Sequence, residues 1–457
     1  MKTNILSLLL AAAQSFVCAC GAANQDYIVH EWGTFTSVQG AEGVPIAWNP
    51  LQTTKLPKFV YDWTKPGLNR LPAGVLNPGS KSAFVTLQRM ETPVIYFYSD
   101  TERVVDVAVR FPQGLITEWY PQANEIGPSA FPPARWATAL DGWVQQAGLR
   151  PPVAFASLLG KKGVPDSRIR WQQLHLLPAK DHADLTLTLP SDTAGNHYFA
   201  ARETDAALLR VNRPENGKPP EHEKFLFYRG VANFKTPLNV TLGGANEGWF
   251  QLRNTGPAEL RHLFALIVRN GQGQFAYVDA LAPGKLLSID LDGAPGRSPL
   301  GKIVARLSQQ MTEALTREGL YEREAAAMVN TWRESWFEEE GVRVIYTLPR
   351  PWTDEVLPLS LEPTPRQIVR VMVGRAEIIP PTTKWELLRQ IVHYAEGDPA
   401  GRQRAIARVK DLGLGRFFQP ALQSVLGTHP SQEFSRATWE FLNAATRPLD
   451  DKSLATR

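Results

Sequence analysis

The stretch PVIYFYSDTERVVDVAVRF (residues 93–111) decides the fold class of this chain. Two runs rich in β-branched and aromatic residues, each of strand length, flank the turn-forming segment SDTE. Similar runs, separated by Pro and Gly clusters, recur at 115–120, 169–177, 184–189, 224–231 and 238–242. Many short strands of this kind predict β-sandwich architecture.

The pattern changes along the chain. Residues 249–291 resemble consecutive strands of an immunoglobulin-like sandwich, and the Pro/Gly-rich segments 41–83 and 121–166 are expected to be long connections. Residues 302–340 have helical periodicity with a break near Gly319, strands are predicted at 342–348 and 367–374, and short helices follow from 383 to 446. Thr383 and Glu386 fit a capping box, and Asp398 and Pro399 fit N-cap and N1 positions.

We therefore expect a mainly β, sandwich-like α+β multidomain protein with a helical insertion and a small C-terminal helical bundle. The predicted regions are an export signal (1–23), a β region of one or two sandwiches (24–300), a helix followed by strands (301–380) and a helical bundle (381–457). At roughly 100–200 residues per domain, 457 residues fit two to four domains. A dispersed net charge of +4 argues against a nucleic-acid partner.

The first residues have the pattern of a secretory signal. Lys2 precedes the apolar run ILSLLLAAA (5–13), and small residues follow at 19–23. We expect an exported protein, periplasmic or anchored to the outer membrane, with no transmembrane span after signal removal, because no later stretch is apolar enough.

Both cysteines, Cys18 and Cys20, lie in or beside this signal, so no disulfide is expected within the mature chain. VCAC (17–20) is similar to the lipobox of bacterial lipoproteins, which makes Cys20 a lipidation candidate. Ordinary cleavage after Gly21 or Ala23 fits equally well.

The first candidate site lies in YIVHEWGTFTSVQG (27–40). In a strand, His30 and Glu31 point to opposite faces and cannot share a ligand unless a bulge forms at Gly33. His30 is therefore either a single metal ligand or, as we favour, a hydrogen-bonded residue of an ordinary first strand.

The second candidate is HYFAARETDAALLRV (197–211). In strand register Glu203 and Asp205 share a face about 7 Å apart, a spacing that suits a metal or a carboxylate pair, and His197 lies about 20 Å away on the same face. The favoured alternative is surface ion pairing with a neighbouring arginine, Arg202, Arg210 or Arg213.

The third candidate is TWRESWFEEEG (331–341). Trp332 and Trp336 are predicted to form an apolar stripe, and Glu338, Glu339 and Glu340 are predicted in the last helical turn, where the helix dipole disfavours carboxylates. Compensation by cation binding is one interpretation. Salt bridging is the favoured one, with arginines close in sequence: Arg343, Arg350, Arg366, Arg370 and Arg375.

Aromatic residues supply a different candidate. Trp119 and Tyr120, together with Trp136 and Trp143, could stack on sugar rings if they are accessible.

Four motifs together resemble a group of exported bacterial proteins of uncharacterised function. These are HEWGTFTSVQG (30–40), METPVIYFYS (90–99), HYFAARETDA (197–206) and WRESWFEEEGVRVIY (332–346). The resemblance covers most of the mature chain and implies export and a shared fold. It assigns no catalytic residue.

Three functions remain open. The preferred one is an envelope protein that binds a glycan-like ligand on a β scaffold. The second is a metal-dependent hydrolase in which a divalent metal is held by a convergent set, His30, His197, Glu203, Asp205 and Glu338–Glu340. The third is a structural protein whose C-terminal helices dock an envelope protein, and it predicts a large exposed apolar patch on those helices.

Overall fold

The structure is a computed structural model. It describes residues 27–51, 56–62, 84–127, 153–154, 167–178, 189–192, 197–213, 217–244, 247–293, 296–426 and 431–446. The predicted signal with Cys18 and Cys20 lies outside the described residues, as do Trp136 and Trp143.

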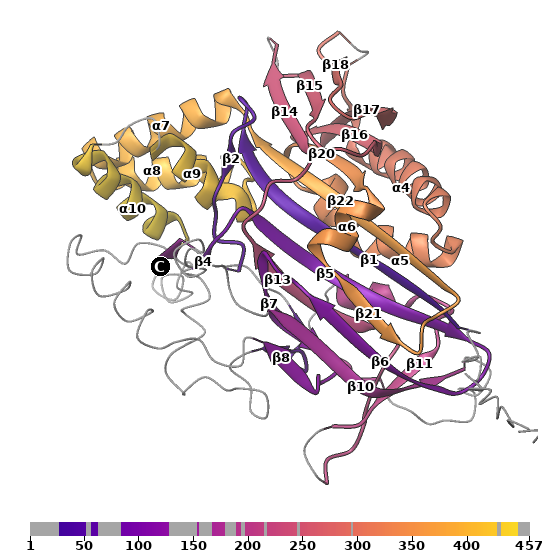
Figure 1. The fold of residues 1–457 in the computed structure, drawn as a ribbon. Coiled ribbons are helices and arrows are strands. Elements are labelled where there is room, and N and C mark those ends of the chain that lie inside the picture. The colour runs from indigo at the N-terminus through magenta and orange to yellow at the C-terminus, as the bar shows by residue number, and fades with distance from the viewer. Residues whose placement is uncertain are drawn as a thin grey trace, which may run out of the picture.

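An eleven-stranded sheet is the centre of the fold (Figure 1). Its order is β19-β17-β16-β20-β22-β1-β5-β13-β7-β3, with β2 paired to β1. The bounds are β1 Tyr27–Gly40, β2 Pro45–Ile46, β3 Tyr61–Asp62, β5 Gln88–Ser99, β7 Gly114–Tyr120, β13 Leu226–Ala232, β16 Leu260–Arg269, β17 Gln272–Leu281, β19 Ser298–Pro299, β20 Gly341–Leu348 and β22 Gln367–Ile379.

Strand β1 lies in the middle of this sheet, parallel to β22 and antiparallel to β5. All fourteen of its residues are buried, which explains why its sequence is apolar or aromatic at so many positions. Its register with β22 is uninterrupted, whereas its register with β5 shifts between Trp32 and Thr34. The two strands that flank β1 therefore come from distant parts of the chain, β5 from its N-terminal part and β22 from its C-terminal part.

Three smaller sheets complete the β structure. A six-stranded sheet has the order β12-β11-β10-β6-β21 with β8 on β10, a three-stranded sheet has the order β14-β15-β18, and β4 pairs with β9. The bounds are β4 Phe84–Val85, β6 Arg103–Arg110, β8 Glu125–Gly127, β9 Val153–Ala154, β10 Arg168–Leu177, β11 Leu208–Val211, β12 Glu221–Glu223, β14 Leu238–Gly243, β15 Trp249–Asn254, β18 Leu286–Asp290 and β21 Leu359–Glu362.

Helices cover the large sheet and gather beside one end of it (Figure 1). Their bounds are η3 His197–Arg202, α4 Leu300–Arg317, α5 Glu322–Arg333, η4 Glu334–Glu338, α6 Arg350–Val356, α7 Pro381–Glu396, α8 Pro399–Lys410, η5 Gly415–Phe417, α9 Phe418–Leu426 and α10 Gln432–Thr446. Among the described residues, each helix is too short or too polar to cross a membrane.

The predicted fold class, mainly β with a C-terminal helical region, is confirmed. The predicted break between helices occurs at Gly319, whose φ of +106° suits glycine. The immunoglobulin-like stretch 249–291 divides between sheets, because β16 and β17 join the large sheet while β15 and β18 join the three-stranded one. Since β20 and β22 pair within the large sheet, regions 24–300 and 301–380 share one sheet.

Two hydrophobic clusters hold these layers together. The larger contains the sheet strands with α4 and α5, including the fully buried Trp32 and Trp336. The smaller joins Val38, Trp48 and Ile379, at one end of the large sheet, to Phe417 and Phe441 of the C-terminal helices. Burying a side chain of this size contributes about 1.5–3 kcal/mol relative to exposure. The C-terminal helices are thus packed on the sheet end through their own apolar cluster.

The helix starts are partly as predicted. Asp398 caps α8 by accepting a hydrogen bond from the Gly401 N–H at 2.7 Å, with Pro399 at N1. The predicted capping box at Thr383 and Glu386 is wrong, because α7 already begins at Pro381. The fixed φ of proline suits this first helical position.

Candidate functional site

His30 and Glu31 lie on opposite faces of β1, as the alternation predicts. The His30 Nδ1 is 2.6 Å from Glu324 Oε2 of α5. On the other face the Glu31 carboxylate accepts hydrogen bonds from the Tyr228 hydroxyl and from Arg370 Nε, each at 2.5 Å. The favoured interpretation of His30, a hydrogen-bonded residue of a buried strand, describes what the structure shows.

The His30 ring lies in an aromatic enclosure. Tyr98 and Tyr321 contact it with ring centroids 5.1 and 4.7 Å away, and the Tyr98 hydroxyl donates to Glu324 Oε2 at 3.0 Å. The groups that meet at Glu324 Oε2 are one imidazole, one carboxylate and one phenol. They form a hydrogen-bonded cluster, because a metal site of this kind would need further ligands.

The strand register assumed for residues 197–205 is wrong. His197 lies in the 3₁₀ helix η3, and a strand begins only at Leu208, because the 197–202 segment coils against α5 and the Trp332 ring. Glu203 accepts a hydrogen bond from Asn330 at 3.4 Å, and the exposed Asp205 pairs with Arg323. The two carboxylates therefore bind separate partners on α5.

The three glutamates Glu338–Glu340 do not share a last α-helical turn. The α-helix ends at Arg333 and a π-helical turn follows, so the three side chains diverge. Glu338 pairs with Arg333 at 3.1 Å, and Glu339 pairs with Arg375 at 2.8 Å. Salt bridges thus compensate the charges of Glu338 and Glu339, and Arg375 is one of the arginines named from the sequence.

Glu340 binds protein backbone. Its carboxylate accepts hydrogen bonds from the N–H groups of Asn270 and Gly271, at 3.1 and 3.4 Å. Within the described ranges, which include every metal candidate named above, no three His, Cys, Asp or Glu side chains group as a metal site. In the described structure these candidates therefore do not converge on one site.

The aromatic platform is also placed differently from the prediction. Trp119 and Tyr120 are 0% and 3% exposed, because both faces of β7 are covered, so neither can stack on a ligand at the surface. Among the described residues, the exposed indoles are those of Trp385 of α7, at 69%, and Trp249 of β15, at 37%. A helix beginning at Pro381 turns the Trp385 side chain outward while Leu387 and Ile391 face the core.

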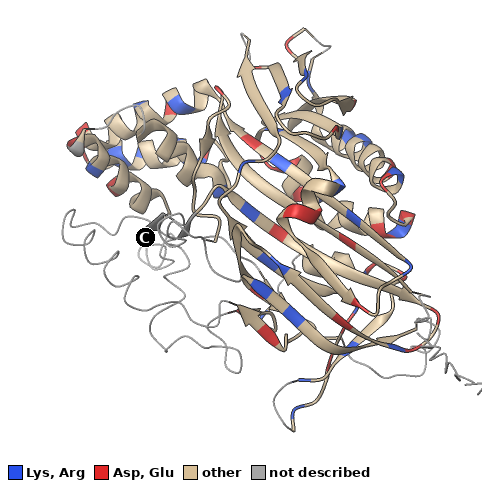
Figure 2. Ribbon diagram, viewed as in Figure 1, with Lys and Arg blue, Asp and Glu red and all other residues tan. Residues whose placement is uncertain are grey.

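A buried arginine–glutamate cluster occupies the face of the large sheet beneath η4. We define it by six residues from four segments: Glu91, Glu339, Arg343, Arg375, Glu377 and Arg416. Figure 2 shows charged segments side by side on the central strands. Five of these residues lie within the sheet or η4 region, whereas Arg416 comes from the C-terminal helices, so the cluster ties the two parts together.

Glu91 and Arg416 form the central contact of this cluster. Arg416 Nη1 is 2.7 Å from Glu91 Oε1, and the Thr36 hydroxyl donates to the same oxygen at 2.5 Å. Arg416 Nη2 also donates to Ser335 Oγ at 3.0 Å. Burial alone would raise the pKa of Glu91, but Arg416 and Arg89 together hold that pKa well below its usual range.

Arg375 organises the other half of the cluster. It donates to the Ser335 carbonyl oxygen at 2.5 Å and pairs with Glu377 at 2.7 Å and Glu339 at 2.8 Å. Burial raises the pKa of Glu339, yet Arg375 and Arg416 lower that pKa overall. The Glu339 carboxylate is therefore held ionised inside the protein.

Two irregular backbone features border the cluster. Thr92, directly after Glu91, has φ +41°, and η4 is a π-helical turn that places Ser335 above the arginines. Such features cost energy and concentrate at functional sites. Two of the three predicted stretches, 27–40 and 331–341, meet here, through Thr36, Ser335 and Glu339 instead of through His30.

A cleft of about 410 Å³ opens beside this cluster; we call it the sheet-end cleft. Its walls come from the ends of β16, β20 and β22, from the first turns of α7, and from the segment after α8. Phe417 lies in its wall, and the guanidinium carbons of Arg375 and Arg416 lie 4.8 and 4.9 Å from that ring. Its volume is within the usual range for small-ligand sites.

The polar groups of the sheet-end cleft include hydroxyls, carboxylates and a guanidinium. Thr382 and Thr383 lie at the start of α7, and Glu386 follows one turn later. Arg408 of α8 is positioned by Glu386, 3.1 Å away. Asp411 makes no side-chain hydrogen bond or ion pair with the described part of the chain, so its carboxylate is available to a ligand.

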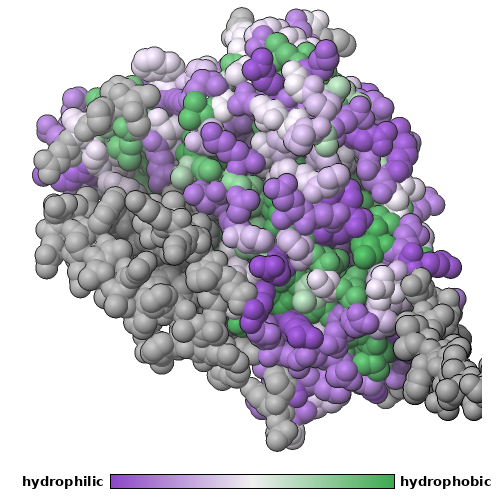
Figure 3. Space-filling model, viewed as in Figure 1, coloured by the Kyte–Doolittle hydropathy of each residue, from purple (hydrophilic) through white to green (hydrophobic). Residues whose placement is uncertain are grey.

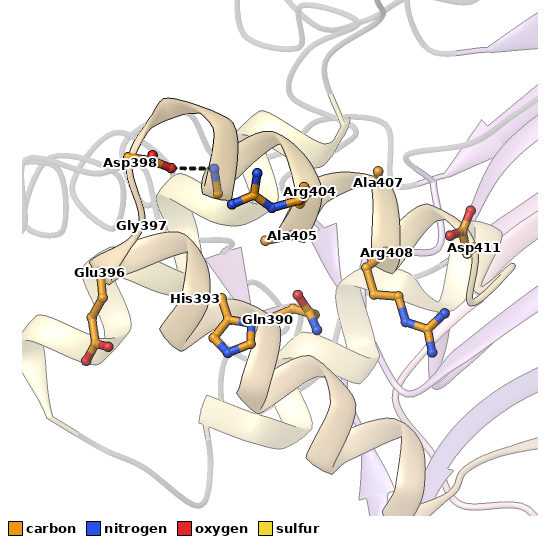
Figure 4. A pocket seen from close by; sticks show the side chains of 11 residues that line it. Gln390, His393, Glu396, Gly397, Asp398, Arg404, Ala405, Ala407, Arg408 and Asp411 are labelled. Carbon is orange, nitrogen blue, oxygen red and sulfur yellow. Dashed lines mark hydrogen bonds between the residues drawn. The ribbon is translucent and has the colours of Figure 1, made fainter.

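A second, more open space of about 690 Å³ lies between α7 and α8; we call it the α7–α8 cavity (Figure 4). Gln390 and His393 line it from α7, and Arg404 lines it from α8. Arg408 and Asp411 line both spaces.

No protein-family model and no curated protein matches the chain. Trp385 and Phe417 could have been singled out from sequence only through the register of their helices, because neither belongs to a recognisable motif.

Proposed function

We propose that this protein is an exported cell-envelope protein that binds a glycan-like ligand in the sheet-end cleft. The observation that carries the proposal is a cleft lined by hydroxyls and carboxylates, with the exposed Trp385 on α7, the helix that forms one of its walls. A flat apolar face next to hydrogen-bonding groups is what a sugar ring requires, since one face of the ring is apolar and its rim carries hydroxyls.

The register of α7 supports this pairing. Thr382 and Glu386 are one turn apart on the face that lines the cleft. Trp385 is about 60° from Thr382 and about 100° from Glu386 around the helix, so the indole lies next to this face but outside the residues that line the cleft. Carboxylates such as Asp411 accept hydrogen bonds from hydroxyls, and the guanidinium of Arg408 donates them.

Binding to an array of immobilised glycans tests the proposal, with the mature chain (residues 24–457) as the probe. We expect selective binding that falls at least about tenfold, or about 1.4 kcal/mol, in Trp385→Ala and in Asp411→Asn. The control is Leu286→Ala, which removes an exposed apolar side chain from β18, outside the cleft. Absence of glycan binding, or equal losses in the control, would reject the proposal.

Docking of an envelope protein is the competing interpretation of the same helix. Trp385 and Val392, 69% and 37% exposed, are two turns apart on α7. On the face shown in Figure 3, however, hydrophobic areas are small and interrupted by hydrophilic residues. We therefore rank glycan binding first, and a pull-down in which Trp385→Ala loses a defined envelope protein without any glycan effect would reverse the order.

The N-terminal features belong to the same proposal. An export signal in residues 1–23 places the protein in the periplasm, and lipidation at Cys20 would anchor it to a membrane. Mass spectrometry of the mature N-terminus tests this part. An acylated Cys20 supports the anchor, and an unmodified residue 22 or 24 rejects it.

A further inference from the structure

The sheet-end cleft and the α7–α8 cavity are neighbours that share part of their walls. Arg408 and Asp411 line both. In Figure 4 the side chains follow the two helices, from Glu396 and Asp398 at the interhelical turn to Arg408 and Asp411 at the far end. The two spaces therefore meet at Arg408 and Asp411.

Helix α7 supplies a single polar face along both spaces. Thr382 and Glu386 line the sheet-end cleft, and Gln390 and His393 line the α7–α8 cavity. The spacing of four, four and three residues keeps these side chains on one side of the helix. From the first to the last they span about 16 Å at 1.5 Å per residue, which is longer than one sugar ring.

The α7–α8 cavity offers donors and acceptors that the described part of the chain leaves free. The side chains of His393, Glu396 and Arg404 make no hydrogen bond or ion pair with any residue that the structure describes. Asp398 differs, because its carboxylate caps α8. Free groups of both charge signs suit a neutral, hydroxyl-rich ligand better than a strongly anionic or cationic one.

We propose that the two spaces form one groove that binds an oligosaccharide chain, with one part of the chain in the sheet-end cleft and its continuation in the α7–α8 cavity. This inference rests on the proposed function. It adds that the ligand is a chain of several sugars and that Arg404 and His393 contact its distal units.

Calorimetric titration with a size series tests the inference. The probes are the mono- to hexasaccharides of the linkage that binds best on the glycan array, and the proteins are the wild type, the double variant Arg404→Ala/His393→Ala, and Lys410→Ala. Lys410 is the matched control because it removes an exposed cation from α8 without lining either space.

For the wild type we expect affinity to rise at least about tenfold from the disaccharide to the tetrasaccharide. In the double variant the tetrasaccharide should bind no better than the disaccharide, while disaccharide affinity stays unchanged. Affinity that is independent of length, or an equal loss for both lengths, overturns the extended groove and leaves the proposed function standing. Absence of binding at every length overturns both.

Discussion

Arg416 Nη1 lies 2.7 Å from Glu91 Oε1, so a residue that follows the C-terminal helix α8 pairs with a central strand of the large sheet. The side chains are 12% and 7% exposed. At this depth the pair gains strength from the low dielectric, and each member alone would be a costly buried charge. The contact therefore couples the packing of the C-terminal helices to the interior of the sheet.

Arg416→Ala should lower the free energy of unfolding by about 3–5 kcal/mol, because it leaves the Glu91 carboxylate buried without its nearest cation. Urea unfolding followed by circular dichroism measures the change. The control is Arg389→Ala, which breaks an exposed pair with Glu386 and should cost at most about 1 kcal/mol. Equal, small losses in both variants would show that the cluster contributes little.

The cluster also predicts acid sensitivity. The pKa of Glu91 and that of Glu339 are lowered in the folded protein from an ordinary value of 4.5. A lowered folded pKa means that the stabilisation is complete above the unfolded value and is lost as the pH falls from there toward the folded pKa. Stability should therefore decrease as the pH drops below about 4.5.

Glu339→Gln tests whether this carboxylate contributes to the acid sensitivity, through the slope of the unfolding free energy against pH. In the variant the decrease between about pH 5 and pH 3 should be shallower than in the wild type, because one linked carboxylate is gone. Glu338→Gln, which removes the neighbouring carboxylate paired with Arg333, is the matched control. Identical slopes in all three proteins would contradict the assignment.

Glu324→Gln should cost about 1.5–3 kcal/mol of unfolding free energy, since the buried carboxylate binds both His30 and Tyr98. Glu338→Gln should change stability by less than about 1 kcal/mol, because its partner Arg333 is exposed. Thermal and urea unfolding of the two variants compare them directly. A larger loss in Glu338→Gln would reverse our ranking of the two glutamates.

Two tryptophans provide a contrast between core and surface. Trp336→Ala should cost about 3–5 kcal/mol, because the indole is fully buried against Trp332 and Phe337. Trp385→Ala should stay within about 0.5 kcal/mol of the wild type, because 69% of that side chain is exposed. A destabilised Trp385→Ala would mean that its loss of ligand binding reports misfolding.

Much of the fold followed from local patterns. The strand runs predicted within the described ranges, the helix break at Gly319 and the N-cap at Asp398 depend on neighbouring residues, and each is found in the structure. The run predicted at 184–189 is not among them, because residues 184–188 lie outside the described ranges. The opposite faces of His30 and Glu31 followed from the period of a strand alone. The register assumed for residues 197–205 failed because packing against α5 overrode strand-like composition.

The sequence alone thus determined the β-rich class, the alternation along the first strand and the helical nature of the C-terminal part, since these depend on contacts between residues close in the chain. Only the tertiary structure decided that Glu91 meets Arg416, that Trp119 is buried and Trp385 exposed, and that two spaces meet at Arg408. These outcomes depend on which distant segments pack together, and side-chain spacing within one segment carries no information about the partner segment across the sheet.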